Sequence, residues 1–166
     1  MCLLWLIPLT LNGGQMVIEL GHGNAKGTAI PSPFVGLRAM VFDSIGPTRH
    51  EVSVPFHDSQ VRNAALLIQT GWDGKWGTDA YWEPGPFLGE HVIFRMVRSG
   101  VRLVGVDFPV SERSSETRLI TTGKIAIVEN LRDLASLPRV GFRFSAVPME
   151  ASLAPVCPVR AFAEIT

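Results

Sequence analysis

Cysteine is scarce in this chain of 166 residues, which contains only Cys2 and Cys157. Two cysteines are too few for a framework of disulfides or for a cysteine cluster that holds a metal. A basic excess is also absent, because 15 lysines and arginines balance 15 aspartates and glutamates. Without such an excess the chain is poorly suited to neutralise phosphates, so no nucleic-acid partner is expected.

A long hydrophobic run that could cross a membrane is lacking as well. Leu3–Leu11 is apolar, but it is shorter than a membrane span. It also lacks the positively charged start and the small-residue cleavage site of a secretion signal. Pro8 and the following Asn12-Gly13-Gly14 indicate an extended segment that ends in a turn. We therefore expect residues 1–15 to form an edge strand or an N-terminal arm on a neighbour, in a cytoplasmic protein without a membrane partner.

What the chain does contain is typical of a compact globular protein. Hydrophobic residues make up 46% of the chain and charged residues 18%. No repeat or long linker divides the sequence, so we expect a single domain over residues 1–166. Twelve prolines and sixteen glycines are spread along the chain, which favours many short elements with tight connections.

The central part of the sequence predicts a strand, a helix and a second strand. Residues 64–70 form a continuous apolar run that ends at Gly71, as in a strand buried on both faces. Residues 87–99 have helical periodicity and stop at Gly100, and residues 101–106 read as another buried strand. This order favours a crossover unit with parallel pairing. Further strands are predicted at residues 16–20, 124–128, 141–147 and 159–164, with an extended segment at 30–34, which gives an α/β fold with more strand than helix.

Several segments resemble one known family. Leu66–Pro109 contains LLIQTGWDGKWGTDAYWEPGPFL and HVIFRMVRSGVRLVGVDFP, which are similar to the strand, TGW loop, helix and GVD-x-P strand of the cyclase-type metal hydrolases. This is the family of kynurenine formamidase and isatin hydrolase. KIAIVENL with the following Leu137-Pro138, and the closing FRFSAVPME and PVRAFAEI, also resemble the family's segments. Ser44–Arg49 (SIGPTR) is similar to the entry of its "VGP" strand. The matches cover about two thirds of the chain in the family's order.

The resemblance implies a layered β/β/α fold (swivelling-domain-like) with mixed sheets and few helices, in a homodimer. It also implies Mn²⁺ or Zn²⁺, which activates a water for attack on an amide, formamide or lactam carbonyl by lowering the pKa of that water. The family's ligands come from a His-x-Gly-Thr-His-x-Asp-x-Pro-x-His motif. Its first two histidines and its aspartate bind metal, and its last histidine acts as acid and base. A later histidine, twelve residues before a glutamate, completes the site.

This chain departs from that motif at nearly every functional position. The matching segment is GHGNAKGTAIPSPF, and less sequence precedes it than the family pattern implies. When it is anchored on Pro31 and Phe34, residues that cannot bind metal fall on five of the six functional positions: Gly23, Gly27, Ala29, Pro33 and Thr117. His22 lies one residue from the first ligand position, so His22 and Glu129 are the only candidate metal ligands. No resident cofactor is expected, unless a rearranged site binds manganese or zinc.

Glu129 is the one functional position of the motif that keeps a suitable residue. It follows an apolar strand and is expected to point inward, where a carboxylate without a metal has to be paired or protonated. Lys26, Arg118 and Arg160 are the candidate partners. Two interpretations stay open: Glu129 is a catalytic acid or base, or it is a hydrogen-bonded relic of the old site.

Aromatic residues crowd the loop after the first buried strand. Trp72, Trp76 and Trp82 are candidate substrate-binding residues, because flat rings in this region of the family lie near the substrate mouth. The alternative is that they only pack against one another. His50 and His57 are expected to diverge rather than to rebuild a metal site, and His91 is expected on the surface of the helix.

The sequence therefore predicts a relative of these hydrolases that has lost their metal site. Such a protein would bind a small aromatic or carbonyl-bearing molecule, or catalyse ring closure without a metal. Two alternatives stay open. One is an active metal-dependent amide, formamide or lactam hydrolase with a rearranged site, and the other is a non-catalytic partner subunit of an active paralogue.

Overall fold

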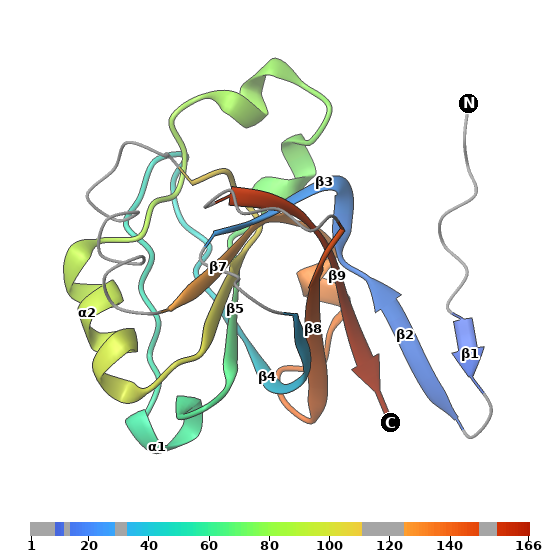
Figure 1. Ribbon diagram of the computed structural model, residues 1–166. Coiled ribbons are helices and arrows are strands. Elements are labelled where there is room, and N and C mark those ends of the chain that lie inside the picture. Colours follow the sequence, from blue (N-terminus) through green and yellow to red (C-terminus); the bar gives the residue numbers. More distant parts are fainter. Residues whose placement is uncertain (1–8, 12–13, 29–32, 111–124, 150–155) are drawn as a thin grey trace.

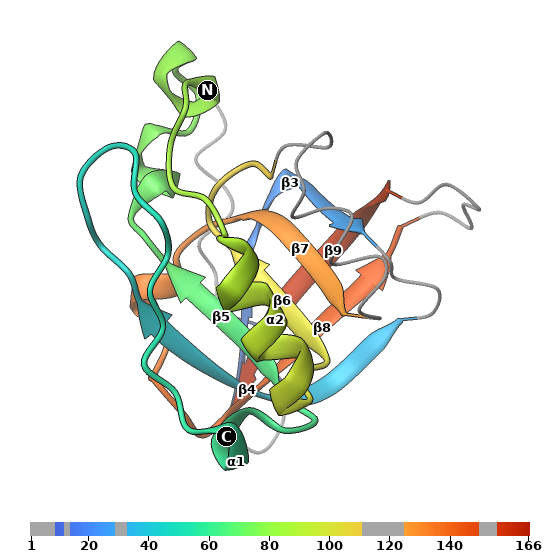
Figure 2. The ribbon, with the colours of Figure 1, turned by 90° about the vertical axis from the view of Figure 1, so that its left-hand side faces the viewer.

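The structure is a computed structural model of the chain, shown in Figure 1. It describes all residues except 1–8, 12–13, 29–32, 111–124 and 150–155. Strands make up most of the regular structure, and one long helix packs on one side of them (Figure 2).

Four parallel strands form the central sheet, in the spatial order β4 (Phe34–Asp43), β5 (Ala65–Gln69), β6 (Leu103–Val106) and β7 (Ala126–Leu131). Every residue of β5 is buried, as its continuous apolar sequence predicts. Helix α2 (Glu90–Ser99) connects β5 to β6. The predicted strand–helix–strand crossover with parallel pairing is confirmed.

Antiparallel strands close this sheet into a barrel. β8 (Phe142–Pro148) pairs with β4 on one edge and with β9 (Val156–Ile165) on the other. β9 also pairs with β3 (Gly21–Thr28) and with β2 (Gln15–Glu19), and β3 pairs with β7. The closed ring therefore runs β3-β7-β6-β5-β4-β8-β9 and returns to β3. β1 (Leu9–Leu11) pairs with β2 beyond the ring (Figure 1), as expected for an edge strand.

The alternation of side chains along the central strands produces two cores. Leu66 and Ile68 of β5 face α2, whereas Ala65 and Leu67 face the barrel interior. Gly105 of β6 fits between interior side chains, because a Cβ there would lie 2.5 Å from Leu67 Cδ2. The molecule thus has three layers, namely β8 and β9 with their neighbours, then the parallel sheet, then α2. This is the layered β/β/α fold that the resemblance implies.

The structure corrects some of the predicted boundaries. The helix begins at Glu90 rather than at residue 87, because the Phe87 backbone N–H donates to the His50 carbonyl (3.1 Å) in a bridge to the preceding loop. The strand expected to begin in Ser44–Arg49 is instead β4, which ends at Asp43, and residues 44–49 form no strand. β3 was not predicted as a strand at all. Its glycine-rich sequence has a low strand propensity, but β7 and β9 hold it from both sides.

The other helices are single turns: α1 (Asp58–Val61), η1 (Trp72–Lys75), η2 (Asp79–Trp82) and η3 (Leu134–Ser136). η1 and η2 belong to the loop between β5 and α2, which rises above the sheet in Figure 1. Within the described part of the chain, no helix has the length and apolar character needed to cross a membrane.

Candidate ligand pocket

A buried carboxylate joins the carboxyl ends of β5 and β6. Asp107 follows β6 and is completely buried, and Thr70 follows the neighbouring strand β5. The backbone N–H groups of Thr70 and Gly71 each donate to Asp107 Oδ2 at 2.8 Å. The Thr70 hydroxyl donates to Asp107 Oδ1 at 2.5 Å. One side chain therefore fixes the start of the loop that follows β5.

The environment of Asp107 changes its acidity. Burial raises the pKa of the Asp107 carboxyl from 3.8 to about 6, because the charged form loses its contact with water. The hydrogen bonds from Thr70 and Gly71 act in the opposite direction, since they favour the carboxylate. Desolvation is the larger effect, so Asp107 gains its proton at a higher pH than an exposed aspartate does.

Tyr81 extends this buried network to β7. Its hydroxyl donates to Asn130 Oδ1 at 2.8 Å, and its ring is fully buried. Burial, with the nearby negative charge of Asp107, raises the pKa of the Tyr81 hydroxyl far above its usual value. The hydroxyl therefore stays protonated and acts as a donor. Asn130 has a positive φ of 60°, a conformation that asparagine adopts more readily than most residues.

The same network positions Trp72. Gly71 has a φ of +81°, which lets the chain turn sharply after Thr70. The indole N–H of Trp72 donates to the Tyr81 carbonyl at 3.0 Å. A Cβ on Gly85 would lie 2.6 Å from the indole ring, so only glycine allows this close approach. Trp72 is therefore held as a rigid wall, and it is only 5% exposed.

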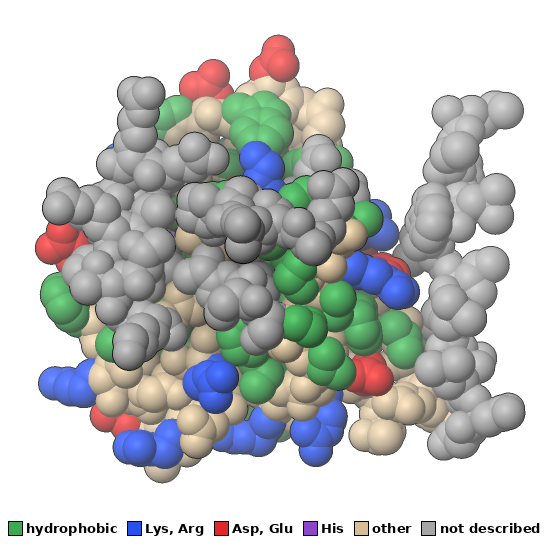
Figure 3. All heavy atoms as spheres, viewed as in Figure 1, with side chains coloured by type: hydrophobic (Ala, Val, Ile, Leu, Met, Phe, Trp, Pro, Cys, Tyr) green, Lys and Arg blue, Asp and Glu red, His purple; other side chains and the backbone are tan. Residues whose placement is uncertain are grey.

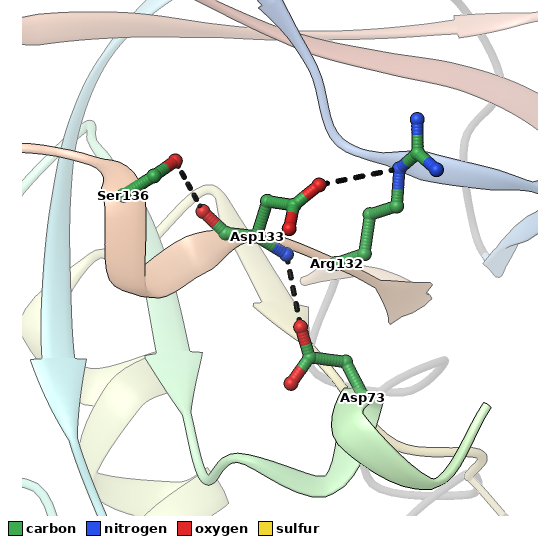
Figure 4. A network of polar contacts seen from close by, with 4 residues as sticks. All are labelled: Asp73, Arg132, Asp133 and Ser136. Carbon is green, nitrogen blue, oxygen red and sulfur yellow. Dashed lines mark hydrogen bonds and ion pairs between the residues drawn. The ribbon is translucent and has the colours of Figure 1, made fainter. Parts of the chain in front are cut away.

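A second contact ties the loop to the turn that follows β7. Asp73, in the first turn of η1, accepts a hydrogen bond from the backbone N–H of Asp133 at 2.9 Å (Figure 4). Asp133 has a positive φ of 57°, and its carbonyl accepts from the Ser136 hydroxyl at 2.7 Å. Its carboxylate lies 3.5 Å from Arg132 Nε. The loop is thus tied both to β6 and to the turn after β7.

A cavity of about 720 Å³ lies beside this loop. Its aromatic and proline walls come from the β5–α2 loop and from the residues after β6, while charged side chains of both signs complete the lining. The lining residues are Lys26, Arg49, Trp72, Trp82, Glu83, Pro84, Gly85, Pro86, Phe87, Leu88, Phe108, Pro109, Val110 and Glu129. The cavity therefore lies at the carboxyl ends of the parallel strands, where α/β proteins commonly bind ligands.

Glu129 lies on the wall of this cavity that β7 provides. Its Oε2 accepts a hydrogen bond from the backbone N–H of Val110 at 2.7 Å. In the pairing of β3 with β7, Glu129 is directly opposite Lys26, so the two side chains lie on the same face of the sheet. Of the partners considered from the sequence, Lys26 is therefore brought beside Glu129. Arg160 instead pairs with Glu19, and Arg118 lies outside the described residues.

The predicted aromatic residues have different positions around the cavity. Trp72 and Trp82 line it, and Trp82 is 63% exposed at its mouth. Trp76 is not among the lining residues; its ring packs edge-on against Tyr81, with centroids 4.9 Å apart. The loop therefore supplies two tryptophans to the cavity and uses the third for packing.

The family's metal positions do not assemble a metal site among the residues that the structure describes. Gly27 is opposite Val128, on the side of β3 that faces the barrel interior. Gly23 is in the irregular part of β3, and Pro33 is exposed. Ala29 and Thr117 lie outside the described residues, as does the side chain of His22.

The chemistry of the donors leads to the same conclusion. In the described part of the chain, no three His, Cys, Asp or Glu side chains come together. The position opposite Glu129 carries the ammonium group of Lys26, which would repel a divalent cation. A transition-metal site normally needs three or four donors, so the residues that the structure describes do not fit one.

The other three histidines, His50, His57 and His91, are not among the residues that line the cavity. The ring nitrogens of His50 lie 2.7 Å from the Pro47 carbonyl and 2.8 Å from the Ser44 carbonyl. His57 is exposed at the start of α1. His91 is on the surface of α2, as predicted, and its Nδ1 lies 2.9 Å from Glu51 Oε1.

Asp107, Thr70 and Asn130 were not predicted as site residues from the sequence. A signal was present, because Thr70 and Asp107 each come directly after a buried apolar strand. The carboxyl ends of adjacent parallel strands meet at one edge of the sheet, so polar residues there are candidates for contact. Asn130 had no comparable signal, because its role depends on the hydroxyl of Tyr81.

Comparisons of sequence place this chain among known proteins. The profile of the family described as "Putative cyclase" matches residues 22–113, which is more than half of the chain. The "Uncharacterized protein MJ0783" of Methanocaldococcus jannaschii is 30% identical over 102 residues, or 59% of this chain. Those residues correspond to 52% of that protein, so the chain spans about half the length of the curated relative it matches.

Solved structures with the same fold include isatin hydrolase A from Ralstonia solanacearum, with a TM-score of 0.69 and 14% identity, covering 96% of this chain and 87% of that one. A second is described as a potential metal-dependent hydrolase with cyclase activity. Its TM-score is 0.64 at 15% identity, over 87% of this chain and 79% of that one. Isatin hydrolase A from Labrenzia aggregata, bound to benzyl benzoate, has a TM-score of 0.66 at 16% identity, and the match covers 83% of this chain and 63% of that one. At identities this low, the structural similarity shows a shared fold and nothing more. The profile match over more than half of the chain shows the family: the chain belongs to the cyclase family.

Proposed function

We propose that this chain is a metal-independent member of its family that binds a small planar molecule carrying an aromatic ring or a carbonyl group. The observation that carries the proposal is the pairing of Lys26 with Glu129 on the wall of an aromatic cavity. In the sequence this segment takes the place of the metal-binding motif. A lysine and a glutamate in opposite register positions thus stand where metal ligands would be needed.

The size and lining of the cavity support a small ligand. A volume of about 720 Å³ lies within the range of sites for drug-sized molecules. Trp82 and the half-buried Phe87 offer ring surfaces, and Trp72 is fixed behind them by its hydrogen bond to the Tyr81 carbonyl. Flat rings of this kind favour planar ligands through stacked or edge contacts.

Lys26 and Glu129 provide the polar anchors of the proposed site. The ammonium group of Lys26 would donate to a carbonyl or carboxylate oxygen of the ligand, and Glu129 would accept from an N–H or O–H group. The same two groups could assist ring closure. A nucleophilic N–H would add to a carbonyl carbon within the ligand, its proton would move to Glu129, and Lys26 would stabilise the charge that develops on the carbonyl oxygen.

Calorimetric titration with benzamide and benzaldehyde as aromatic carbonyl probes tests the binding. We expect Trp82→Ala to weaken binding about threefold to tenfold, because one aromatic contact is lost. Phe94→Ala is the matched control, because Phe94 is a similarly exposed aromatic residue (58%) on α2, outside the cavity lining. The proposal fails if neither probe binds at millimolar concentration or if both variants lose affinity equally.

Elemental analysis of the purified protein, with and without added Mn²⁺ and Zn²⁺, tests the independence from metal. We expect a metal-to-chain ratio near zero, and a ratio near one would contradict the proposal. The second candidate, a metal-dependent hydrolase of amides, formamides or lactams, draws support from the solved relatives described as metal-dependent hydrolases. It requires an activity that EDTA abolishes and that His22→Ala greatly reduces.

We also propose that the protein is a homodimer. Among the described residues β1 is the last strand on its side of the sheet, and the edge of such a strand is a surface on which another chain can pair. Light scattering on the purified protein should give twice the mass of the 18.1 kDa chain. A monomeric mass, or a stable complex only with a different chain, would favour the partner-subunit alternative.

A further inference from the structure

A group of exposed arginines occupies the end of the molecule opposite the ligand pocket. We call it the arginine face, and it consists of Arg38, Arg62, Arg98, Arg102 and Arg143. Arg62 precedes β5, Arg102 precedes β6 and Arg98 is in the last turn of α2. These residues therefore lie where the central strands begin. Figure 3 shows Lys and Arg side chains along the lower edge of the molecule, near α1 and the lower ends of β4 and β8 in Figure 1.

Register and backbone contacts place two of these side chains, Arg38 and Arg143, beside each other. Arg38 of β4 is directly opposite Arg143 of β8, and both side chains are exposed on the same face. Arg38 Nη2 donates to the Arg62 carbonyl at 3.0 Å, and Arg143 Nη1 donates to the Gly36 carbonyl at 2.8 Å. The guanidinium groups of these two arginines are thus oriented by main-chain oxygens.

Within the described part of the chain, the arginine face forms no ion pair with an acidic residue. Two exposed arginines elsewhere do form ion pairs, since Arg139 pairs with Asp43 at 2.9 Å and Arg160 pairs with Glu19. Glu164 of β9 is directly opposite Arg143 on its other side and so lies on the same face, and its carboxylate accepts a hydrogen bond from Gln15 Nε2 at 3.2 Å. Asp58 of α1 is also exposed at this end, and its carboxylate accepts a hydrogen bond from the Ser99 hydroxyl at 2.8 Å.

The row Arg38, Arg143 and Glu164 across three strands thus holds two guanidinium groups and one carboxylate. Two like charges directly opposite on neighbouring strands destabilise a sheet. Guanidinium groups present flat, paired donors that fit carboxylates. A partner with several carboxylates would therefore offset the repulsion between Arg38 and Arg143.

We propose that the arginine face is a docking surface for an acidic segment of a partner protein, rich in aspartate and glutamate. The equal numbers of acidic and basic residues favour this partner over a nucleic acid. A nucleic acid is gathered by an extended positive field, whereas a short acidic segment needs only local complementarity. Because the face and the pocket are at opposite ends of the strands, a docked partner leaves the pocket open.

Fluorescence anisotropy with a labelled short poly-glutamate peptide tests this proposal in about 0.1 M salt, where the Debye length is about 10 Å. We expect the double variant Arg38→Gln/Arg143→Gln to bind about tenfold more weakly than the unmodified chain, because two charge contacts are removed. Arg160→Gln is the matched control, since it removes an exposed arginine from another part of the surface. Circular dichroism and thermal unfolding verify that both variants fold.

Four results would overturn the proposal. They are no binding of the peptide by the unmodified chain, an equal loss in the Arg160→Gln variant, tighter binding of an oligonucleotide than of the peptide, and salt-sensitive self-association through the arginine face. The third would assign the face to a nucleic acid, and the fourth to a second copy of this chain.

Discussion

The two ends of the parallel sheet differ in where their charged side chains lie: buried at one end and exposed at the other. At the carboxyl end, Asp107 is completely buried and accepts three hydrogen bonds from Thr70 and Gly71. At the amino end, Arg38 and Arg143 are exposed and lie opposite each other, and neither forms an ion pair among the described residues, although Glu164 is the cross-strand neighbour of Arg143. A buried charge requires complete satisfaction by the protein, whereas an exposed one is left to water or to a partner.

The contrast shows where rigidity and where adaptability are located in this fold. The hydrogen bonds of Asp107 fix the loop that carries Trp72, so the cavity wall that Trp72 forms is held in place by the protein itself. The arginine face offers exposed side chains that a partner can draw into contact. Substitutions at the two ends should therefore differ in size and in sign.

The largest effect is expected for Asp107→Ala. This change leaves the N–H groups of Thr70 and Gly71 without their acceptor in a buried site, so the free energy of unfolding should fall by about 3 kcal/mol. Asp58→Ala is the control at the amino end, where the Ser99 hydroxyl keeps its bond to the Arg95 carbonyl. Its loss should stay below about 1 kcal/mol. Urea unfolding measures both, and equal losses would invalidate the contrast.

The acidity of Asp107 gives a second, pH-dependent effect. Its pKa in the fold is about 6, above the value of 3.8 for an unperturbed side chain, so the folded state holds more protons between these two values. The contribution of Asp107 to stability should therefore fall as pH rises from about 4 to about 6 and then level off. The expected size is on the order of 2 to 3 kcal/mol. Urea unfolding across this range, with Asp107→Asn as the non-titrating reference, measures the difference. A difference that increases with pH would show that the hydrogen bonds outweigh the burial.

The smallest effect is expected at the amino end, and it has the opposite sign. Arg38→Gln removes one of two facing positive charges, so the isolated chain should become more stable by about 0.5 kcal/mol. Arg139→Gln breaks an ion pair with Asp43 and should be neutral or slightly destabilising. Thermal unfolding at low salt compares the two variants. Destabilisation by Arg38→Gln would show that its bond to the Arg62 carbonyl matters more than the repulsion.

The sequence predicted the parts of the fold that depend on local patterns. The apolar run in β5, the helical periodicity of α2 and the strand before Asp107 all have a clear signal, and their parallel arrangement follows from connection rules. β3 could not be found this way, because its glycines give no strand pattern and its neighbours come from distant parts of the chain. The start of α2 was also misplaced, since it depends on the contact between Phe87 and His50.

The candidate site was predicted in outline only. The aromatic loop and Glu129 were identified from their resemblance to family segments, and Lys26 was one of three possible partners. The register of β3 against β7 places Lys26 on the same face as Glu129, and a single-residue shift would turn Lys26 to the other face of the sheet. The role of Trp76 in packing also depends on three-dimensional position, because its sequence context does not differ from that of Trp72 or Trp82.

The closure of the barrel by β9 has a consequence for how the chain reaches this structure. β9 pairs with β2 and β3 near the other end of the sequence, and Glu19 and Arg160, which meet across this seam, are 141 positions apart. Such contacts bring a large loss of chain entropy before they bring stabilisation, so they slow folding. During synthesis, the parallel strands and α2 leave the ribosome well before β9, and the barrel stays open in that interval. Met16 and Ile165 are direct neighbours, so a circularly permuted chain that runs from β9 into β2 would turn the slowest contact into a local hairpin.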